Sequence, residues 1–96
     1  MKHVMVSRIT MYEKNPAEFE VRTYEASEKK KLLEYMRSFE FFEVAGLIED
    51  CRTGEELREE CLGFNDGTFV WSSQDIYHLE RYDAAVCEEF IKKVVG

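Results

Sequence analysis

Residues 63–95, GFNDGTFVWSSQDIYHLERYDAAVCEEFIKKVV, decide the fold, because a turn, a strand and two helices can be read there from local chemistry. Asp66 and Gly67 stand between apolar, β-prone residues, and both residue types tolerate positive φ. The pair therefore predicts a tight β-hairpin. Ser72 with Asp75 three residues later has the spacing of a capping box, which predicts a helix directly after the second strand of that hairpin.

Two helices are expected in the second half of this stretch. The first begins at about Gln74 and carries an apolar stripe at helical spacing, made of Ile76, Tyr77, Leu79 and Tyr82. Asp83 is expected to cap the second helix. The apolar stripe of that helix consists of Val86, Phe90, Ile91 and Val94.

Strands are expected on the N-terminal side of the chain as well. Residues 3–12 are rich in β-branched and apolar side chains, and Pro16 breaks that pattern. Residues 18–24 then alternate between apolar and charged side chains, which is the period of a half-buried strand. The two segments predict a hairpin, and Ser27 is expected to open an amphipathic helix after it.

Residues 41–50 give the third strand signal, and Gly54 offers a turn. Residues 55–64 favour a helix by propensity, yet a strand there would complete a meander with short local connections. We therefore predict a strand. The expected fold is a single α+β domain over residues 1–96, with order ββαβββαα and a five-stranded antiparallel sheet that carries its helices on one face.

Composition supports a folded, water-soluble chain. Hydrophobic residues make up 45% of the 96 residues and charged residues 34%, which suits one domain with a core. The sequence shows no membrane-spanning run and no signal peptide, so a cytoplasmic location and no membrane contact are expected. Three cysteines fit reduced thiols, with a bridge between Cys51 and Cys61 left open as an alternative.

Charge is the most distinctive feature. Residues 38–96 hold fourteen acidic side chains and five basic ones. The carboxylates expected to bind a partner are Glu43, Glu49, Asp50, Glu55, Glu56, Glu59, Glu60 and Asp66. They either form the solvated side of an acidic protein or meet a basic protein surface, such as that of a nuclease or a nucleic-acid-handling complex. Direct nucleic-acid binding is not expected, because it needs clustered basic residues.

Other candidate sites are weaker. Trp71 and Tyr77 are either aromatic contacts for the partner or part of the core. His78 would need a nucleophile within hydrogen-bond reach to act as a general base, and no motif supplies one. No catalytic residue, metal site or cofactor is therefore predicted, since the ligand spacings of zinc sites and the loop of an EF-hand are both lacking.

Several segments between residues 53 and 82 resemble a group of known sequences. The segments NDGTFVWSS (65–73), IYH (76–78) and ERY (80–82), preceded by TGE (53–55), resemble the C-terminal half of small uncharacterised proteins from mobile elements and phages of gut bacteria. The resemblance implies an accessory protein, such as an inhibitor, an anti-defence factor or an immunity protein. A binding protein is thus the leading expectation, ahead of a structural homodimer and of a small enzyme that uses His78.

Overall fold

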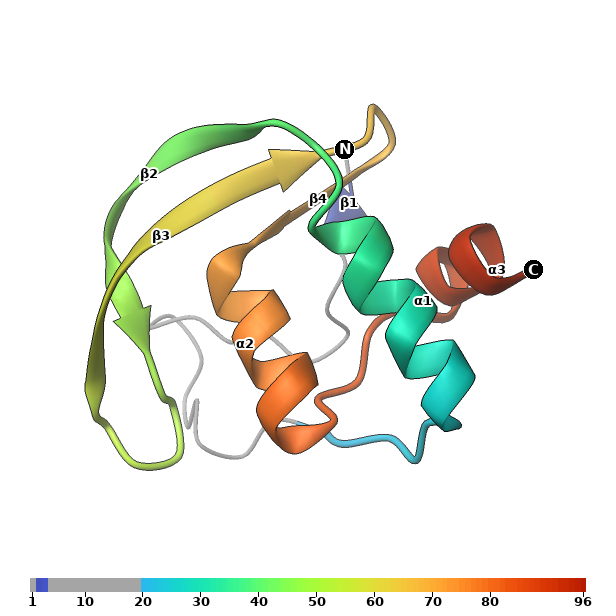
Figure 1. The fold of residues 1–96 in the computed structure, drawn as a ribbon, viewed down its shortest axis with the longest axis horizontal. Helices are drawn as coiled ribbons and strands as arrows, with labels where there is room; N and C mark the ends of the chain where they lie inside the picture. The colour runs from blue at the N-terminus through green and yellow to red at the C-terminus, as the bar shows by residue number, and fades with distance from the viewer. Residues whose placement is uncertain (1, 4–19) are drawn as a thin grey trace.

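The computed structural model describes residues 2–3 and 20–96, and this part of the chain is an α+β fold with three helices and four strands (Figure 1). The strands are β1 (Lys2–His3), β2 (Phe41–Glu49), β3 (Glu56–Asn65) and β4 (Phe69–Ser72). The helices are α1 (Ala26–Met36), α2 (Ser73–Tyr82) and α3 (Glu88–Val95).

The four strands form one open sheet in the order β1-β4-β3-β2. β2, β3 and β4 are an antiparallel meander, while β1 runs parallel to β4. The predicted strand at residues 55–64 is confirmed as β3, and the predicted hairpin turn joins β3 to β4. Phe64 of β3 is the cross-strand partner of Trp71, and this pairing places two aromatic side chains together in the core. Such packing stabilises the strand more than local propensity stabilises a helix.

Most of β3 pairs only with β2. β4 pairs with Gly63 to Asn65 of β3, so the preceding part of β3 and the part of β2 from Glu43 onward form a two-stranded ribbon that curves away from the rest of the sheet (Figure 1). The register shifts twice along this ribbon, and Gly46 takes a φ of 98° between the paired residues Glu43 and Leu47. Only glycine adopts that backbone readily, so Gly46 permits the bend.

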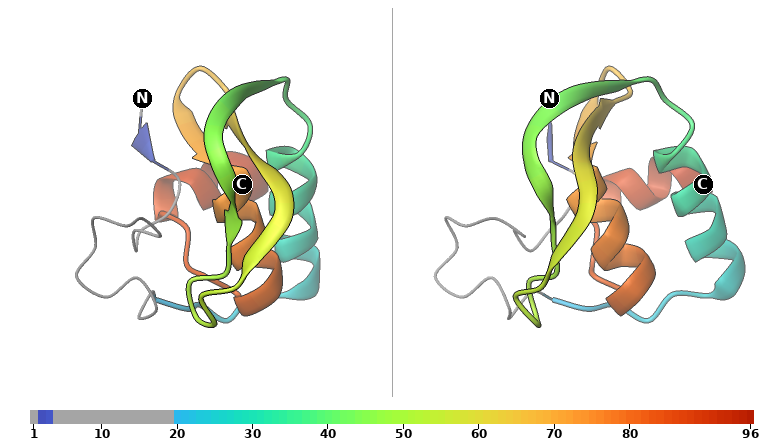
Figure 2. Two further views of the ribbon diagram at one scale, coloured as in Figure 1. Left: turned by 90° about the vertical axis from the view of Figure 1, so that its left-hand side faces the viewer. Right: turned by 60° about the vertical axis from the view of Figure 1, so that its left-hand side comes forward.

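The helices lie together on one side of the sheet (Figure 2). Trp71 of β4 is at the centre of the core and is 2% exposed. Its indole N–H donates to the carbonyl of Met36 at the end of α1, at 2.9 Å, and its ring contacts Phe39, Phe64 and Phe90. One buried aromatic residue therefore joins α1, α3 and the sheet.

The expected cap of the second helix is wrong. Asp83 ends α2 instead, with a left-handed backbone (φ 58°), and α3 begins only at Glu88. Residues 84–87 stay extended because their backbone groups form hydrogen bonds with residues 20–24. Ala85 N donates to Glu20 O at 2.9 Å, and the Tyr24 hydroxyl donates to Ala84 O at 2.8 Å. Tertiary pairing overrides the local helix signal.

The expected N-terminal hairpin falls mostly outside the described residues. Within them, β1 covers only the start of the predicted strand at 3–12, and residues 20–24 form a single bridge, Val21 with Ala84, instead of a full strand. The sheet therefore has four strands in the described part of the chain, where five were predicted. Cys51, Cys61 and Cys87 are free thiols, so the bridge left open between Cys51 and Cys61 is not formed.

Candidate partner-binding surface

The ribbon of β2, the loop after it and β3 carries a row of exposed carboxylates. We call this surface the acidic ribbon, and its members are Glu43, Glu49, Glu55, Glu56, Glu59 and Glu60. Among the described residues, every ion pair involves other carboxylates, so none of these six is neutralised by a lysine or arginine within 4.0 Å. Arg52 and Arg58 are the basic residues of the same segment, so the ribbon keeps an excess of negative charge that faces solvent.

Two of these carboxylates face each other directly. Glu49 of β2 and Glu56 of β3 are cross-strand partners in the register. Like charges in that position destabilise a sheet, by an amount in the range of about 0.2–1 kcal/mol. The folded chain thus keeps an unfavourable pair that a nearby cation would relieve.

Replacing Glu56 with lysine is expected to raise the free energy of unfolding by about 0.5 kcal/mol, because an attractive cross-strand pair with Glu49 replaces a repulsive one. Urea denaturation at low salt measures the change. Glu55→Lys is the matched control, since Glu55 is exposed and adjacent but precedes the first residue of β3. Equal stabilisation by both variants would show that net charge, and not the facing pair, is responsible.

Asp50, in contrast, is buried at the end of the ribbon. Its Oδ1 accepts from the backbone N–H groups of Arg52 at 2.9 Å and Thr53 at 3.1 Å, and its Oδ2 accepts from the hydroxyls of Tyr77 and Tyr82 of α2. Burial alone would raise the pKa of Asp50, but these four donors hold it well below its usual range. The same contact raises the pKa of Tyr77 to about 12. Asp50 is therefore a charged anchor of the β2–β3 loop.

Two more side chains of α2 fasten the same loop. Gln74 accepts from the N–H of Glu49 at 3.0 Å and donates to its carbonyl. His78 is 0% exposed, and its Nε2 accepts from Cys51 N at 3.0 Å while its Nδ1 lies 2.8 Å from the carbonyl of Gln74. This places the proton on Nδ1, and burial lowers the pKa of His78. Both ring nitrogens are thus engaged by the backbone, which makes His78 a buried anchor of the loop.

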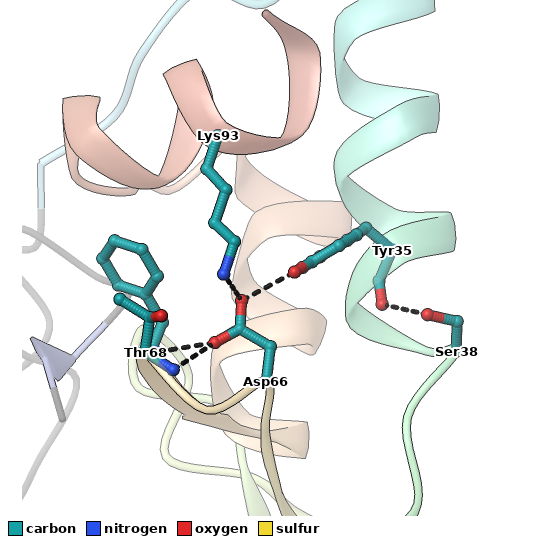
Figure 3. A network of polar contacts seen from close by, with 6 residues as sticks. Tyr35, Ser38, Asp66, Thr68 and Lys93 are labelled. Carbon is teal, nitrogen blue, oxygen red and sulfur yellow. Dashed lines mark hydrogen bonds and ion pairs between the residues drawn. The ribbon is translucent and has the colours of Figure 1, made fainter.

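Asp66 repeats the arrangement of Asp50 at the other end of β3 (Figure 3). Its Oδ1 accepts from the N–H groups of Thr68 at 2.9 Å and Phe69 at 2.7 Å, and its Oδ2 accepts from the Tyr35 hydroxyl at 2.6 Å and from Lys93 Nζ at 2.8 Å. Burial would raise the pKa of Asp66, but Lys93 and the other donors hold it well below its usual range. Asp66 thereby ties the hairpin to α1 and α3.

The structure divides the predicted site residues into two groups. The six glutamates lie together on the acidic ribbon. Asp50, Asp66 and Trp71 are enclosed by the fold, and the Tyr77 hydroxyl is held by Asp50, so these four do not belong to the exposed charged surface. A sequence signal for the two aspartates did exist: each precedes a glycine-containing turn and bonds backbone N–H groups two and three residues on, as aspartates in turns commonly do.

A groove lies between the ribbon and α2, and sequence reasoning gave no indication of it. Its volume is about 520 Å³, and Ile48, Leu62, Phe64 and Ile76 supply apolar lining. Glu59 and Glu60 of the acidic ribbon line it as well. The groove arises where β3 leaves β4 and continues as the ribbon, so it depends on the sheet geometry more than on any local motif.

Comparison of the chain with protein-family models, curated proteins and solved structures gives no match. No helix in the described residues has the length and apolar character needed to cross a membrane. Within residues 2–3 and 20–96, His, Cys, Asp and Glu side chains nowhere gather in threes suited to a metal ion.

Proposed function

We propose that this protein is a small binding protein, of the inhibitor, anti-defence or immunity type, that docks its acidic ribbon on a basic surface of another protein. The observation that carries the proposal is the facing pair Glu49 and Glu56, together with four further exposed glutamates that have no cation partner among the described residues. A basic surface, such as the nucleic-acid-binding face of a nuclease, would neutralise this charge and relieve the repulsion.

The anchoring contacts suit a rigid binding surface. Asp50, Gln74 and His78 fix the end of β2 and the loop after it, which carry Glu49 and Glu55, so little conformational freedom remains there to be lost on association. Rigid presentation of this kind favours affinity, since less ordering accompanies binding. The exposed charge also speeds the encounter with an oppositely charged partner.

Reversal of Glu55, Glu56, Glu59 and Glu60 to lysine is expected to reduce recovery of the partner at least tenfold, because repulsion replaces attraction at the contact. The measurement is a tagged pull-down from a bacterial lysate, quantified by mass spectrometry. Circular dichroism melts show whether the variant remains folded. Unchanged recovery of a basic partner by the folded variant would contradict the proposal.

The control for total charge reverses Glu25, Glu34, Glu88 and Glu89, four exposed glutamates on or next to the helices. It changes net charge by the same amount as the ribbon variant while leaving the acidic ribbon intact. Full recovery of the partner by this control, with loss by the ribbon variant, places the interaction on the ribbon. Equal loss in both would assign the binding to net charge alone.

A homodimer is the second candidate, and the edge strand favours it. β2 is the last strand of the sheet in the described residues, and Phe41, Phe42 and Leu47 are 60%, 45% and 40% exposed. An exposed apolar edge strand is a template for pairing with a second copy. Sedimentation of the purified chain discriminates the two candidates, because the dimer has twice the monomer mass and is favoured by salt that screens the glutamates.

A further inference from the structure

The groove beside the acidic ribbon combines an apolar floor with exposed carboxylates at its rim. Ile48, Phe64 and Ile76 are buried, and Leu62 is half-buried, so the floor is set by core-facing residues of β2, β3 and α2. Glu59 and Glu60 stand exposed at the rim. A volume of about 520 Å³ falls within the range of binding pockets, about 300–1,000 Å³.

The groove lining already holds one guanidinium. Arg37, the C-cap residue of α1, pairs with Glu80 of α2 at 2.9 Å, and both residues line the groove. That pair neutralises Glu80 and leaves the carboxylates of Glu59 and Glu60 to face an incoming group. The groove thus offers two exposed carboxylates, without a cation partner among the described residues, above an apolar floor, which is complementary to a cation on an aliphatic stem.

We propose that this groove is the anchor site of the interface and receives an arginine side chain from the basic partner. This inference rests on the proposed function and specifies its central contact. The methylenes of the arginine would cover Leu62 and Ile76, and its guanidinium would donate to Glu59 and Glu60.

Arginine fits better than the other occupants. Its planar fork bonds two carboxylates at once, and its weaker hydration lowers the cost of leaving water compared with a lysine ammonium. Arginine is also enriched among the residues that dominate interface energies. A second copy of this chain would bring more carboxylates toward Glu59 and Glu60, so charge disfavours it as the occupant.

The test is a titration of the full chain with a capped hexa-arginine peptide at low salt, followed by NMR. Methyl signals of Ile48, Leu62 and Ile76 report on the groove floor, and those of Leu32 and Leu79, which are 0% exposed, serve as internal controls. We expect the three groove residues to shift and the two controls to stay in place. Capped hexalysine is expected to bind at least threefold more weakly.

Paired neutral variants separate the groove from the ribbon. Glu59→Gln with Glu60→Gln is expected to weaken hexa-arginine binding about tenfold, whereas Glu55→Gln with Glu56→Gln removes the same charge from the ribbon outside the groove and is expected to weaken binding only about threefold. Equal weakening by both pairs, or shifts confined to backbone amides of β2 and β3, would overturn the groove inference and leave the acidic ribbon standing. Absence of any shift with the peptide would count against both.

Discussion

Replacing Asp50 with alanine is expected to lower the free energy of unfolding by about 3 kcal/mol, because four hydrogen bonds to one buried carboxylate are lost together. Two of these donors are backbone groups of the β2–β3 loop, and two are hydroxyls of α2, so the loop also loses one of its attachments to the helix. Urea denaturation followed by circular dichroism measures the change. Glu55→Ala, in the same loop but exposed, is expected to stay within about 0.5 kcal/mol of the wild type.

The same carboxylate gives a dependence on pH. Because the pKa of Asp50 is lower in the folded chain than in the unfolded one, its contribution is complete above the unfolded pKa of about 3.9. It is lost progressively as the pH falls from about 4 toward the lower pKa of the folded chain, where Asp50 becomes protonated. Asp50→Asn is therefore expected to lose less stability than the wild type between pH 5 and pH 2. An equal decrease in the free energy of unfolding of the two proteins between pH 5 and pH 2 would show that Asp50 is not held as a hydrogen-bonded anion.

Replacing Trp71 with alanine is expected to cost about 4 kcal/mol, which is a large part of the about 5–15 kcal/mol that stabilises a typical domain. The variant empties the centre of the core and removes the donor to the Met36 carbonyl. Denaturant unfolding followed by circular dichroism measures this loss, since Trp71 is the single tryptophan of the chain.

Trp71→Phe separates the two parts of that cost. It keeps an aromatic ring against Phe64 and Phe90 but cannot donate to Met36, so a smaller loss of about 1–2 kcal/mol is expected. A Trp71→Ala variant that retains wild-type stability would contradict the central position of this side chain. It would also return Trp71 to the candidate surface contacts.

The elements that could be predicted from the sequence are those whose signals are local. Asp66 and Gly67 in the turn, and Ser72 with Asp75 at the start of α2, predicted the β3–β4 hairpin and the following helix because turn and cap chemistry acts over three or four residues. The strand β3 was predicted because it completes a meander with short connections, although its residues favour a helix. The prediction that Asp83 caps the last helix was wrong because residues 84–86 pair with residues 20–24, and such a long-range contact leaves no local signal in the sequence.

The candidate site could likewise be predicted only in part. Glutamates at 43, 49, 55, 56, 59 and 60 remain exposed as a hydrophilic strand surface should. Asp50 and Asp66 have the same side-chain chemistry as their acidic neighbours but are buried, because tyrosines and a lysine from distant helices complete their hydrogen bonds. The groove could not be foreseen, since it depends on the curvature of β2 and β3 and on where α2 packs against them.

Salt dependence of partner capture tests the role of the acidic ribbon most directly. The tagged chain is used in pull-downs from one lysate at about 0.1 M and about 1 M salt, between which the Debye length falls from about 10 to about 3 Å. We predict a basic partner that is recovered at the lower salt concentration, lost at the higher one, and absent with the ribbon reversal at both. A partner recovered equally at both concentrations, and equally by the reversed variant, would contradict the binding role of the acidic ribbon.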